Sequence, residues 1–395
     1  MTEIEGHCKT MVIDGKHLTS LQRRTLKTGV KAYTERATYA GDFPPVLFIE
    51  LTRNCIARCR YCRKKWVNDP KYDMSGETFQ VILRDYAPHA ALIDLRSYGE
   101  SLMLKNFRRY VEQLGNACRN LRITTTLGCG DDDALKALVD HDVFVSVSFD
   151  AADKRLYEHY RCGISYDTVV RNLKFVSELM LKTYGELRGR MRIGIAPLYR
   201  DNLDFVDGVI EFAHCLHIPE IRILQLASDW YDPNTLYFHK RKLLHVLQKA
   251  IKKAAGYGIE LQFGSPLITQ LKLAEKTCDV CIKPWLYASI MYNGTVRYCD
   301  WQIELEKKRD DFGTVHDGAE NVWNGEVARR VREAHVRSRS FPPACVTCYR
   351  IGRYSDHEHD IDRIFRKWLV TGEDIRERID TLLTGKLLRR ADYDV

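Results

Sequence analysis

From residue 45 onward, short apolar and β-branched runs alternate with longer amphipathic segments. The segment 167–182 illustrates the longer kind, because its apolar residues recur with the period of a helix. Alternating strands and helices predict a parallel sheet, either open or curled into a partial barrel, with ligands at the carboxyl ends of the strands. The predicted strands are residues 46–51, 91–96, 122–127, 143–149, 191–197 and 221–227.

A chain of 395 residues has room for two or three domains. Its N-terminal part has no clean pattern apart from a basic stretch at 18–31, which we interpret as a solvated helix face. The third part is rich in cysteine and contains Asn293-Gly294 between apolar runs, a signal for a β-hairpin. The last part is charged and predicts a helical tail. The expected parts are 1–44, 45–265, 266–355 and 356–395.

The chain carries a mild excess of positive charge. Its 61 Lys and Arg residues against 53 Asp and Glu residues give a net charge of +8, which is compatible with an anionic ligand but does not predict nucleic-acid binding. The longest apolar runs, such as 143–149, are far shorter than the roughly 20 residues of a membrane-spanning helix. The acidic start of the chain lacks the features of a signal peptide. We therefore expect a cytoplasmic protein with no membrane partner.

Clustered cysteines are the second strong feature. In a long chain without an export signal they indicate metal ligands rather than disulfides. Cys55, Cys59 and Cys62 lie in one short segment directly after the first predicted strand. Structural zinc normally takes four ligands. Three thiolates on an iron–sulfur cubane instead leave one iron open to a small molecule.

This C-x3-C-x2-C segment resembles that of the radical S-adenosylmethionine (radical SAM) enzymes, including the aromatic Tyr61 before the third cysteine. The resemblance implies an α/β fold, a partial (β/α)6 barrel, in which Cys55, Cys59 and Cys62 hold a [4Fe–4S] cluster. It also implies that the amino and carboxylate groups of S-adenosylmethionine chelate the open iron. The alternative is an unrelated zinc loop.

Two further segments resemble the cofactor-binding motifs of this family. Tyr98-Gly99-Glu100 is similar to the segment that holds the cofactor amino group, with Tyr98 in place of the family's first glycine. A carboxylate suits an ammonium group. Ser148 and Asp150 are similar to a segment near the cofactor ribose and carboxylate. The structural alternatives are an exposed turn glutamate, an ordinary strand-end serine and a helix N-cap aspartate.

Arg161 resembles the family's arginine that pairs with the cofactor carboxylate. A guanidinium suits this role because it binds a carboxylate through two parallel hydrogen bonds. A plain surface ion pair is the alternative for this residue.

Cys281, Asn293-Gly294, Cys299 and Cys345-Val346-Thr347-Cys348 follow one another in an order that resembles the auxiliary-cluster domains called SPASM and, in shortened form, twitch. This resemblance implies that Cys281, Cys299, Cys345 and Cys348 hold one auxiliary [4Fe–4S] cluster, since no cysteine follows Cys348. Cys278 is an alternative to Cys281. Four thiolates leave no open iron, which suits electron transfer. A tetrahedral zinc site is the alternative.

The short auxiliary domain resembles that of radical SAM dehydrogenases that act on aminocyclitols. We therefore predict that a C–H bond is oxidised, most specifically that an alcohol becomes a ketone and one electron passes to the auxiliary cluster. A base near the hydroxyl is needed, and the candidates at strand ends are Arg200, Gln225 and Asp229. Trp230 and Tyr231 are candidate walls of the site. The expected partners are a sugar, cyclitol or nucleoside substrate and a flavodoxin- or ferredoxin-type reductant.

Three other functions stay open at this level. A carbohydrate epimerase or lyase would need a hydrogen donor, for which Cys118, Cys129, Cys162 and Cys215 are available. A peptide-modifying enzyme often carries a precursor-binding domain, for which the N-terminal part is too short. A non-catalytic metal-binding scaffold would want a fourth ligand at the first cysteine site.

Overall fold

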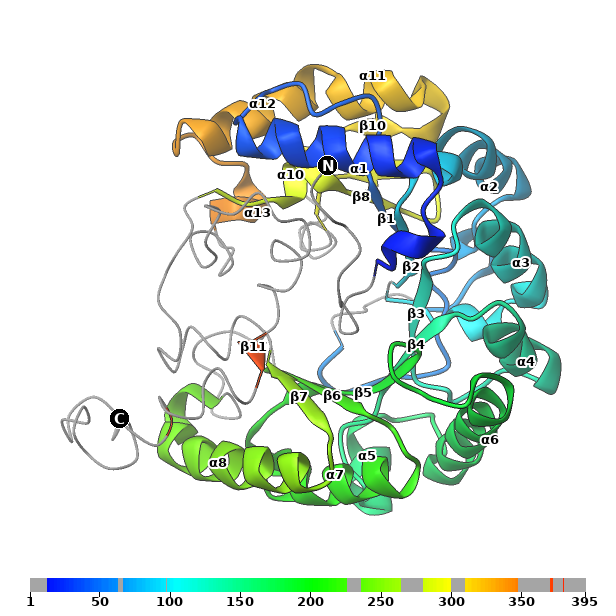
Figure 1. Cartoon of the computed structure of the whole chain (residues 1–395), viewed down its shortest axis with the longest axis vertical. Coiled ribbons are helices and arrows are strands. Elements are labelled where there is room, and N and C mark those ends of the chain that lie inside the picture. The colour runs from blue at the N-terminus through cyan, green and yellow to red at the C-terminus, as the bar shows by residue number, and fades with distance from the viewer. Residues whose placement is uncertain are drawn as a thin grey trace.

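The computed structural model describes residues 13–62, 67–96, 98–225, 236–263, 280–299 and 310–346, together with 370–371 and 379. Strands in these parts form one 11-stranded sheet in the order β10-β9-β8-β1-β2-β3-β4-β5-β6-β7-β11. Figure 1 shows that the sheet curves into an open ring with an outer layer of helices. The predicted α/β partial barrel is confirmed.

Seven strands of this sheet follow one another in parallel, and the first six lie where the sequence predicts them. The seventh, β7, was not among the predicted strands because its four residues carry too little pattern. Its parallel pairing with β6 identifies it as a strand. These strands are β1 (Val46–Ile49), β2 (Leu92–Leu95), β3 (Leu121–Thr125), β4 (Phe144–Ser148), β5 (Met191–Leu198), β6 (Glu220–Gln225) and β7 (Glu260–Phe263).

The outer helices start and end at residues with clear local reasons. Ser165 caps α6 (Tyr166–Tyr184) by accepting from the Thr168 backbone N–H, and Gly185 ends it in the left-handed region at φ 78°. Asp131 caps the helix after β3 in the same way. The other outer helices are α2 (Gly76–Val81), α3 (Phe107–Ala117), α4 (Asp132–Asp140), α5 (Lys154–Tyr160), α7 (Val206–Cys215) and α8 (Lys240–Gly256).

The two faces of the parallel strands differ. Alternate residues such as Ile93, Ile123 and Ile193 are fully buried in the apolar core with the helices. Their neighbours along each strand point to the inner, concave face, because successive side chains in a strand alternate. That inner face includes Asp94 and Arg122.

The cysteine-rich part extends the same sheet. Strand β8 (Tyr287–Ile290) pairs in parallel with β1, and β9 (Thr295–Arg297) returns antiparallel to β8. Gly294 makes the tight turn between them at φ 80°, which confirms the predicted hairpin. The remaining elements are β10 (Gly313–Thr314), α10 (Lys283–Leu286), α11 (Ala319–Asn324), α12 (Glu326–Val336) and α13 (Pro343–Val346).

The N-terminal helix α1 (Ser20–Thr34) covers this extension beside α10, as Figure 1 shows. The interpretation of its basic stretch as a solvated helix face is confirmed, since Arg23 and Lys27 are exposed, while the opposite face with Leu26, Val30 and Tyr33 is buried. The Tyr33 hydroxyl donates to the Val280 carbonyl at 3.2 Å, and its ring lies edge-on against Trp285.

The predicted boundary at 265/266 lies outside the described residues, as does most of the predicted tail. Within the tail, β11 (Val370–Thr371) pairs antiparallel with β7. Among the helices of the described parts, none is both long enough and apolar enough to cross a bilayer.

Candidate functional site

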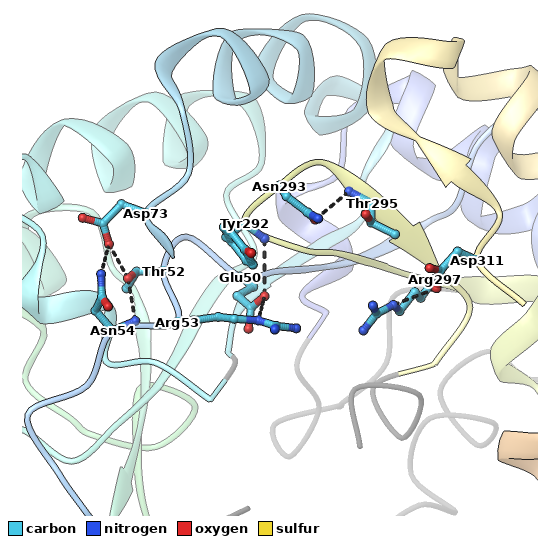
Figure 2. A network of polar contacts seen from close by, with 10 residues as sticks. All are labelled: Glu50, Thr52, Arg53, Asn54, Asp73, Tyr292, Asn293, Thr295, Arg297 and Asp311. Carbon is cyan, nitrogen blue, oxygen red and sulfur yellow. Dashed lines mark hydrogen bonds and ion pairs between the residues drawn. The ribbon is translucent and has the colours of Figure 1, made fainter. Parts of the chain in front are cut away.

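The segment that leads into the first cysteines is held by a polar network (Figure 2). The Asp73 carboxylate accepts hydrogen bonds from the Thr52 hydroxyl at 2.5 Å and from the Asn54 amide at 2.8 Å. The Thr52 hydroxyl oxygen in turn accepts from the Asn54 backbone N–H at 2.9 Å. Gly99 packs on the same segment so closely that a Cβ there would lie 2.1 Å from the Thr52 carbonyl oxygen. Only glycine fits this position.

Cys55, Cys59 and Cys62 follow this segment and are half-buried. Burial raises the pKa of the Cys59 thiol, and Arg161 opposes that effect. In the described part of the chain, no three His, Cys, Asp or Glu side chains are gathered closely enough to hold a single metal ion. The loop nevertheless offers three accessible thiols, the donor chemistry that an iron–sulfur cluster needs.

A buried triad of side chains lies against these cysteines. The Arg161 guanidinium donates to both Asp150 carboxylate oxygens, at 2.7 and 2.9 Å, and the Tyr61 hydroxyl donates to the same carboxylate at 2.5 Å. Burial raises the pKa of Tyr61 well above its usual value, so this hydroxyl keeps its proton. The structure thus brings together three residues that the sequence analysis named separately. Their roles in cofactor binding stay predictions, since here the guanidinium faces Asp150.

The structural alternatives for Asp150 and Arg161 are excluded. The N-cap of α5 is Asp153, which accepts from the Leu156 backbone N–H. Arg161 is 5% exposed and therefore does not form a surface ion pair.

Glu100 lies at the carboxyl ends of β2 and β3. It is 2% exposed, which excludes an exposed turn glutamate. Its carboxylate accepts from the Thr125 hydroxyl at 2.7 Å and from the hydroxyl and backbone N–H of Thr126, both at 2.8 Å. Its own backbone N–H donates to the Asn54 carbonyl at 2.8 Å, so it is tied directly to the cysteine segment.

Tyr98 and Ser148 complete the predicted cofactor-binding set. Tyr98 lies beside Gly99 and is half-buried. Ser148 ends β4, is half-buried, and lies in register with Gly194 of the neighbouring strand. Both residues therefore lie at or just beyond the carboxyl ends of the strands, with Glu100 and Asp150.

Sequence reasoning missed several residues around this edge. The rings of Tyr160 and Tyr199 lie near that of Tyr61, with centroids 6.5 and 6.2 Å from it. Cys129, which the sequence offered only as a hydrogen donor, also lies here: burial raises the pKa of its thiol, and the nearby charges of Glu100 and Cys55 add to the effect. Only the position of these residues just after or before a predicted element hints at their placement.

The predicted catalytic residues are placed only in part. Arg200 begins the short helix η6 (Arg200–Phe205), is exposed, and has its Nε 2.7 Å from the Asp201 carboxylate. Gln225 is the last residue of β6, at the expected edge, but its side chain lies outside the description. Asp229, Trp230 and Tyr231 lie outside the described residues.

The auxiliary site brings together segments that are far apart in the sequence. Cys299 and Cys345 are buried, and Cys281 is half-buried. The Cys345 sulfur lies 3.6 Å from the Tyr298 hydroxyl and 3.4 Å from His335 Nε2. Burial lowers the pKa of His335 to about 4, so the ring is neutral. Cys348 and Cys278 lie outside the described residues, and the four-cysteine set stays a prediction.

Comparisons with known proteins agree with this geometry. Residues 49–189 match the model of the radical SAM superfamily, and residues 281–349 match an iron–sulfur cluster-binding domain of the SPASM type. No curated protein sequence matches significantly. The chain thus belongs to the radical SAM superfamily.

Solved structures show the same fold. Streptococcus suis SuiB bound to S-adenosylmethionine is 16% identical, with a TM-score of 0.57 over 82% of this chain and 77% of that one. The structure of anSMEcpe with bound AdoMet is 15% identical, with a TM-score of 0.57 over 87% of this chain and 99% of that one. Within the superfamily, this chain is a radical SAM enzyme with a SPASM-type auxiliary domain. Its cofactors are S-adenosylmethionine and [4Fe–4S] clusters.

Proposed function

We propose that this enzyme oxidises an alcohol of a small polar substrate, such as a sugar, cyclitol or nucleoside, to a ketone. The substrate loses a hydrogen atom from carbon, a proton from the hydroxyl and one electron, which together make a two-electron oxidation. When bound, S-adenosylmethionine supplies the 5′-deoxyadenosyl radical that takes the hydrogen atom. The auxiliary cluster held by the cysteines of the C-terminal part would accept the remaining electron.

One observation carries this proposal: strand β8 of the auxiliary part pairs directly with β1, the strand that leads to the first cysteines. The Glu50 carboxylate accepts from Arg53 Nε at 3.1 Å and from the Tyr292 backbone N–H at 3.4 Å (Figure 2). The Arg53 guanidinium also lies over the Tyr292 ring, 5.1 Å from its centroid. The two cysteine sites are thus joined through neighbouring strands of one sheet, which supports transfer of an electron from one region to the other.

The chain's own residues have distinct proposed roles. Cys55, Cys59 and Cys62 hold the first cluster, and Cys281, Cys299, Cys345 and Cys348 hold the second. Glu100, Asp150 and Arg161 orient the cofactor, with Tyr61 fixing the Asp150 carboxylate. Of the candidates Arg200, Gln225 and Asp229, only the Asp229 carboxylate can take the hydroxyl proton, because an arginine is already protonated and an amide is not a base.

The test is anaerobic reconstitution with iron and sulfide, followed by single turnover of a panel of polyols. We expect about eight irons per chain, four for each cubane. A substrate with deuterium on the reacting carbon should give deuterated 5′-deoxyadenosine and one equivalent of ketone.

The electron acceptor is tested by electron paramagnetic resonance during the same turnover. The auxiliary cluster should become reduced in step with ketone formation. An epimerised alcohol without ketone, or a modified peptide substrate, would overturn the proposed oxidation while leaving the radical SAM class intact.

A further inference from the structure

The inner face of the barrel carries buried charge where closed barrels usually carry branched aliphatic residues. Asp94 of β2 lies in register with Arg122 of β3, and Ser146 of β4 lies in register with Arg192 of β5. Asp94, Arg122 and Arg192 are 0%, 4% and 3% exposed. Buried charge of this kind is expensive to maintain, so it calls for a function or a partner.

The positive charges outnumber the carboxylates that face them. Asp94 is shared between Arg122, whose Nε lies 2.8 Å away, and Arg96. The Nη2 atom of Arg122 is buried and has no hydrogen-bond partner among the residues that the structure describes. Arg192 Nε donates to the neutral Ser146 hydroxyl at 2.9 Å.

The next carboxylate along the face does not supply a full negative charge. Burial raises the pKa of Glu220 to about 7, so this carboxyl is partly protonated at neutral pH. Burial also lowers the pKa of Arg122 and of Arg192 to about 9, and both guanidiniums therefore remain charged at neutral pH. An anion placed between them would relieve the unfavourable burial of both.

An aromatic ring aligns the two guanidiniums. The Phe144 ring centroid lies 5.7 Å from the Arg122 guanidinium carbon and 5.1 Å from that of Arg192. Stacking on a ring restrains a guanidinium without using its N–H groups. Those groups remain suited to the planar, two-point recognition of a carboxylate or a phosphate.

We propose that Arg122 and Arg192 form an anion-binding subsite for the substrate, which therefore carries a carboxylate or a phosphate group. This inference rests on the proposed function, because it assigns the substrate class of that same site. Arg122 lies three residues before Thr125, which contacts Glu100 at the cofactor edge. At ~3.3 Å per residue, the two levels are about 10 Å apart along the strand, a span suited to a monosaccharide-sized molecule.

The subsite separates the substrate classes that the sequence leaves open. A sugar acid or a sugar phosphate places its anion on the guanidiniums and its carbinol carbon towards the strand ends. A polycationic aminocyclitol meets like charge at the same place. The anionic members of the sugar, cyclitol and nucleoside classes are therefore the favoured substrates.

The binding test uses the reconstituted holoenzyme with S-adenosylmethionine at fixed ionic strength, without reductant. Calorimetry compares glucose 6-phosphate, glucuronate, glucose and glucosamine. We expect one of the two anions to bind at least tenfold more tightly than glucose, and the preferred anion distinguishes a phosphate from a carboxylate site. Equal affinity for all four compounds, or tightest binding of glucosamine, would overturn the inference.

Variants of Arg192 test whether this residue binds the anion. Arg192→Gln should weaken binding of the preferred anion at least tenfold, and Arg192→Lys should recover part of the loss because the charge is restored. Arg190→Gln is the matched control, since Arg190 lies two residues earlier but pairs with Asp142 at 2.8 Å and lies over the Tyr184 ring of α6. Equal weakening in Arg190→Gln and Arg192→Gln would contradict the assignment.

Iron content and circular dichroism verify that each variant is folded. If Arg192→Gln does not fold, the wild-type ligand series decides alone. Anion binding without ketone formation would reject the proposed oxidation and keep the subsite. Oxidation of neutral alcohols with no preference for anions would reject the subsite and keep the oxidation.

Discussion

The two cysteine sites of this enzyme differ in how they are built. Cys55, Cys59 and Cys62 come from a single loop and are half-buried. At the auxiliary site, Cys299 and Cys345 are buried and come from distant segments. Tyr298 and His335 lie against the Cys345 sulfur.

The two sites therefore differ in how easily a small molecule reaches the cluster and in how closely protein groups surround it. A loop with three half-buried thiols suits a cluster with one open iron, and Glu100, Asp150 and Arg161 lie beside that loop. A small molecule reaches a buried site less easily than an open one. The protein groups against the sulfur instead set the polarity around the cluster, and hence its reduction potential. The first site is suited to chemistry and the second to holding an electron.

Cys59→Ala tests the open site and has the largest expected effect. It should remove about four irons per chain and abolish cleavage of S-adenosylmethionine, because two thiolates do not retain the cubane. Iron analysis and chromatography of 5′-deoxyadenosine measure the two losses. Cys215→Ala is the control, since Cys215 is exposed on α7. Retained cleavage in Cys59→Ala would mean that the open site lies elsewhere.

Cys345→Ala tests the buried site. It should also remove about four irons, but cleavage of S-adenosylmethionine should continue while ketone formation falls at least a hundredfold. Cys118→Ala serves as the control, because Cys118 is equally buried but packs against the barrel. If both activities disappear together, the two sites are not separable and the comparison fails.

Glu100→Gln sharpens the account of the open site. Its carboxylate accepts three hydrogen bonds, and an amide would turn an N–H towards one of the donors. We expect stability to fall by about 1–3 kcal/mol and the affinity for S-adenosylmethionine to fall about tenfold. Equilibrium dialysis and thermal unfolding measure the effects, with Glu112→Gln, on the exposed side of α3, as the control. An unchanged affinity would remove Glu100 from the cofactor site.

His335→Phe has the smallest expected effect and probes the insulation of the buried site. His335 Nε2 lies 3.4 Å from the Cys345 sulfur, and a donor there stabilises the more negative, reduced state of the cluster. Its loss should lower the reduction potential by about 60 mV, the one-electron equivalent of about 1.4 kcal/mol. Redox titration followed by electron paramagnetic resonance measures the shift. His335→Gln, which keeps an N–H, should restore part of it, and equal potentials in all three proteins would leave His335 a purely structural role.

The local patterns of the sequence predicted most of the fold. Apolar alternation located six parallel strands, and Asn293-Gly294 located the hairpin. The basic residues predicted the solvated face of α1, but not its buried face, because that face packs on α10, more than two hundred residues later. The short strand β7 needed its pairing with β6 to be identified.

The candidate site divides in the same way. The spacing of Cys55, Cys59 and Cys62 indicates the cluster that they bind. The sequence by itself therefore determined the class of enzyme and its cofactors. Only the tertiary structure decided three other features. These are the pairing of β1 with β8, the contact of His335 with Cys345, and the position of the Arg122 and Arg192 guanidiniums over one ring. The physical reason is the distance along the chain between the residues that determine each feature. A loop motif fixes its neighbours through a few covalent bonds, whereas strand pairing and buried charge depend on residues that only the folded chain brings together.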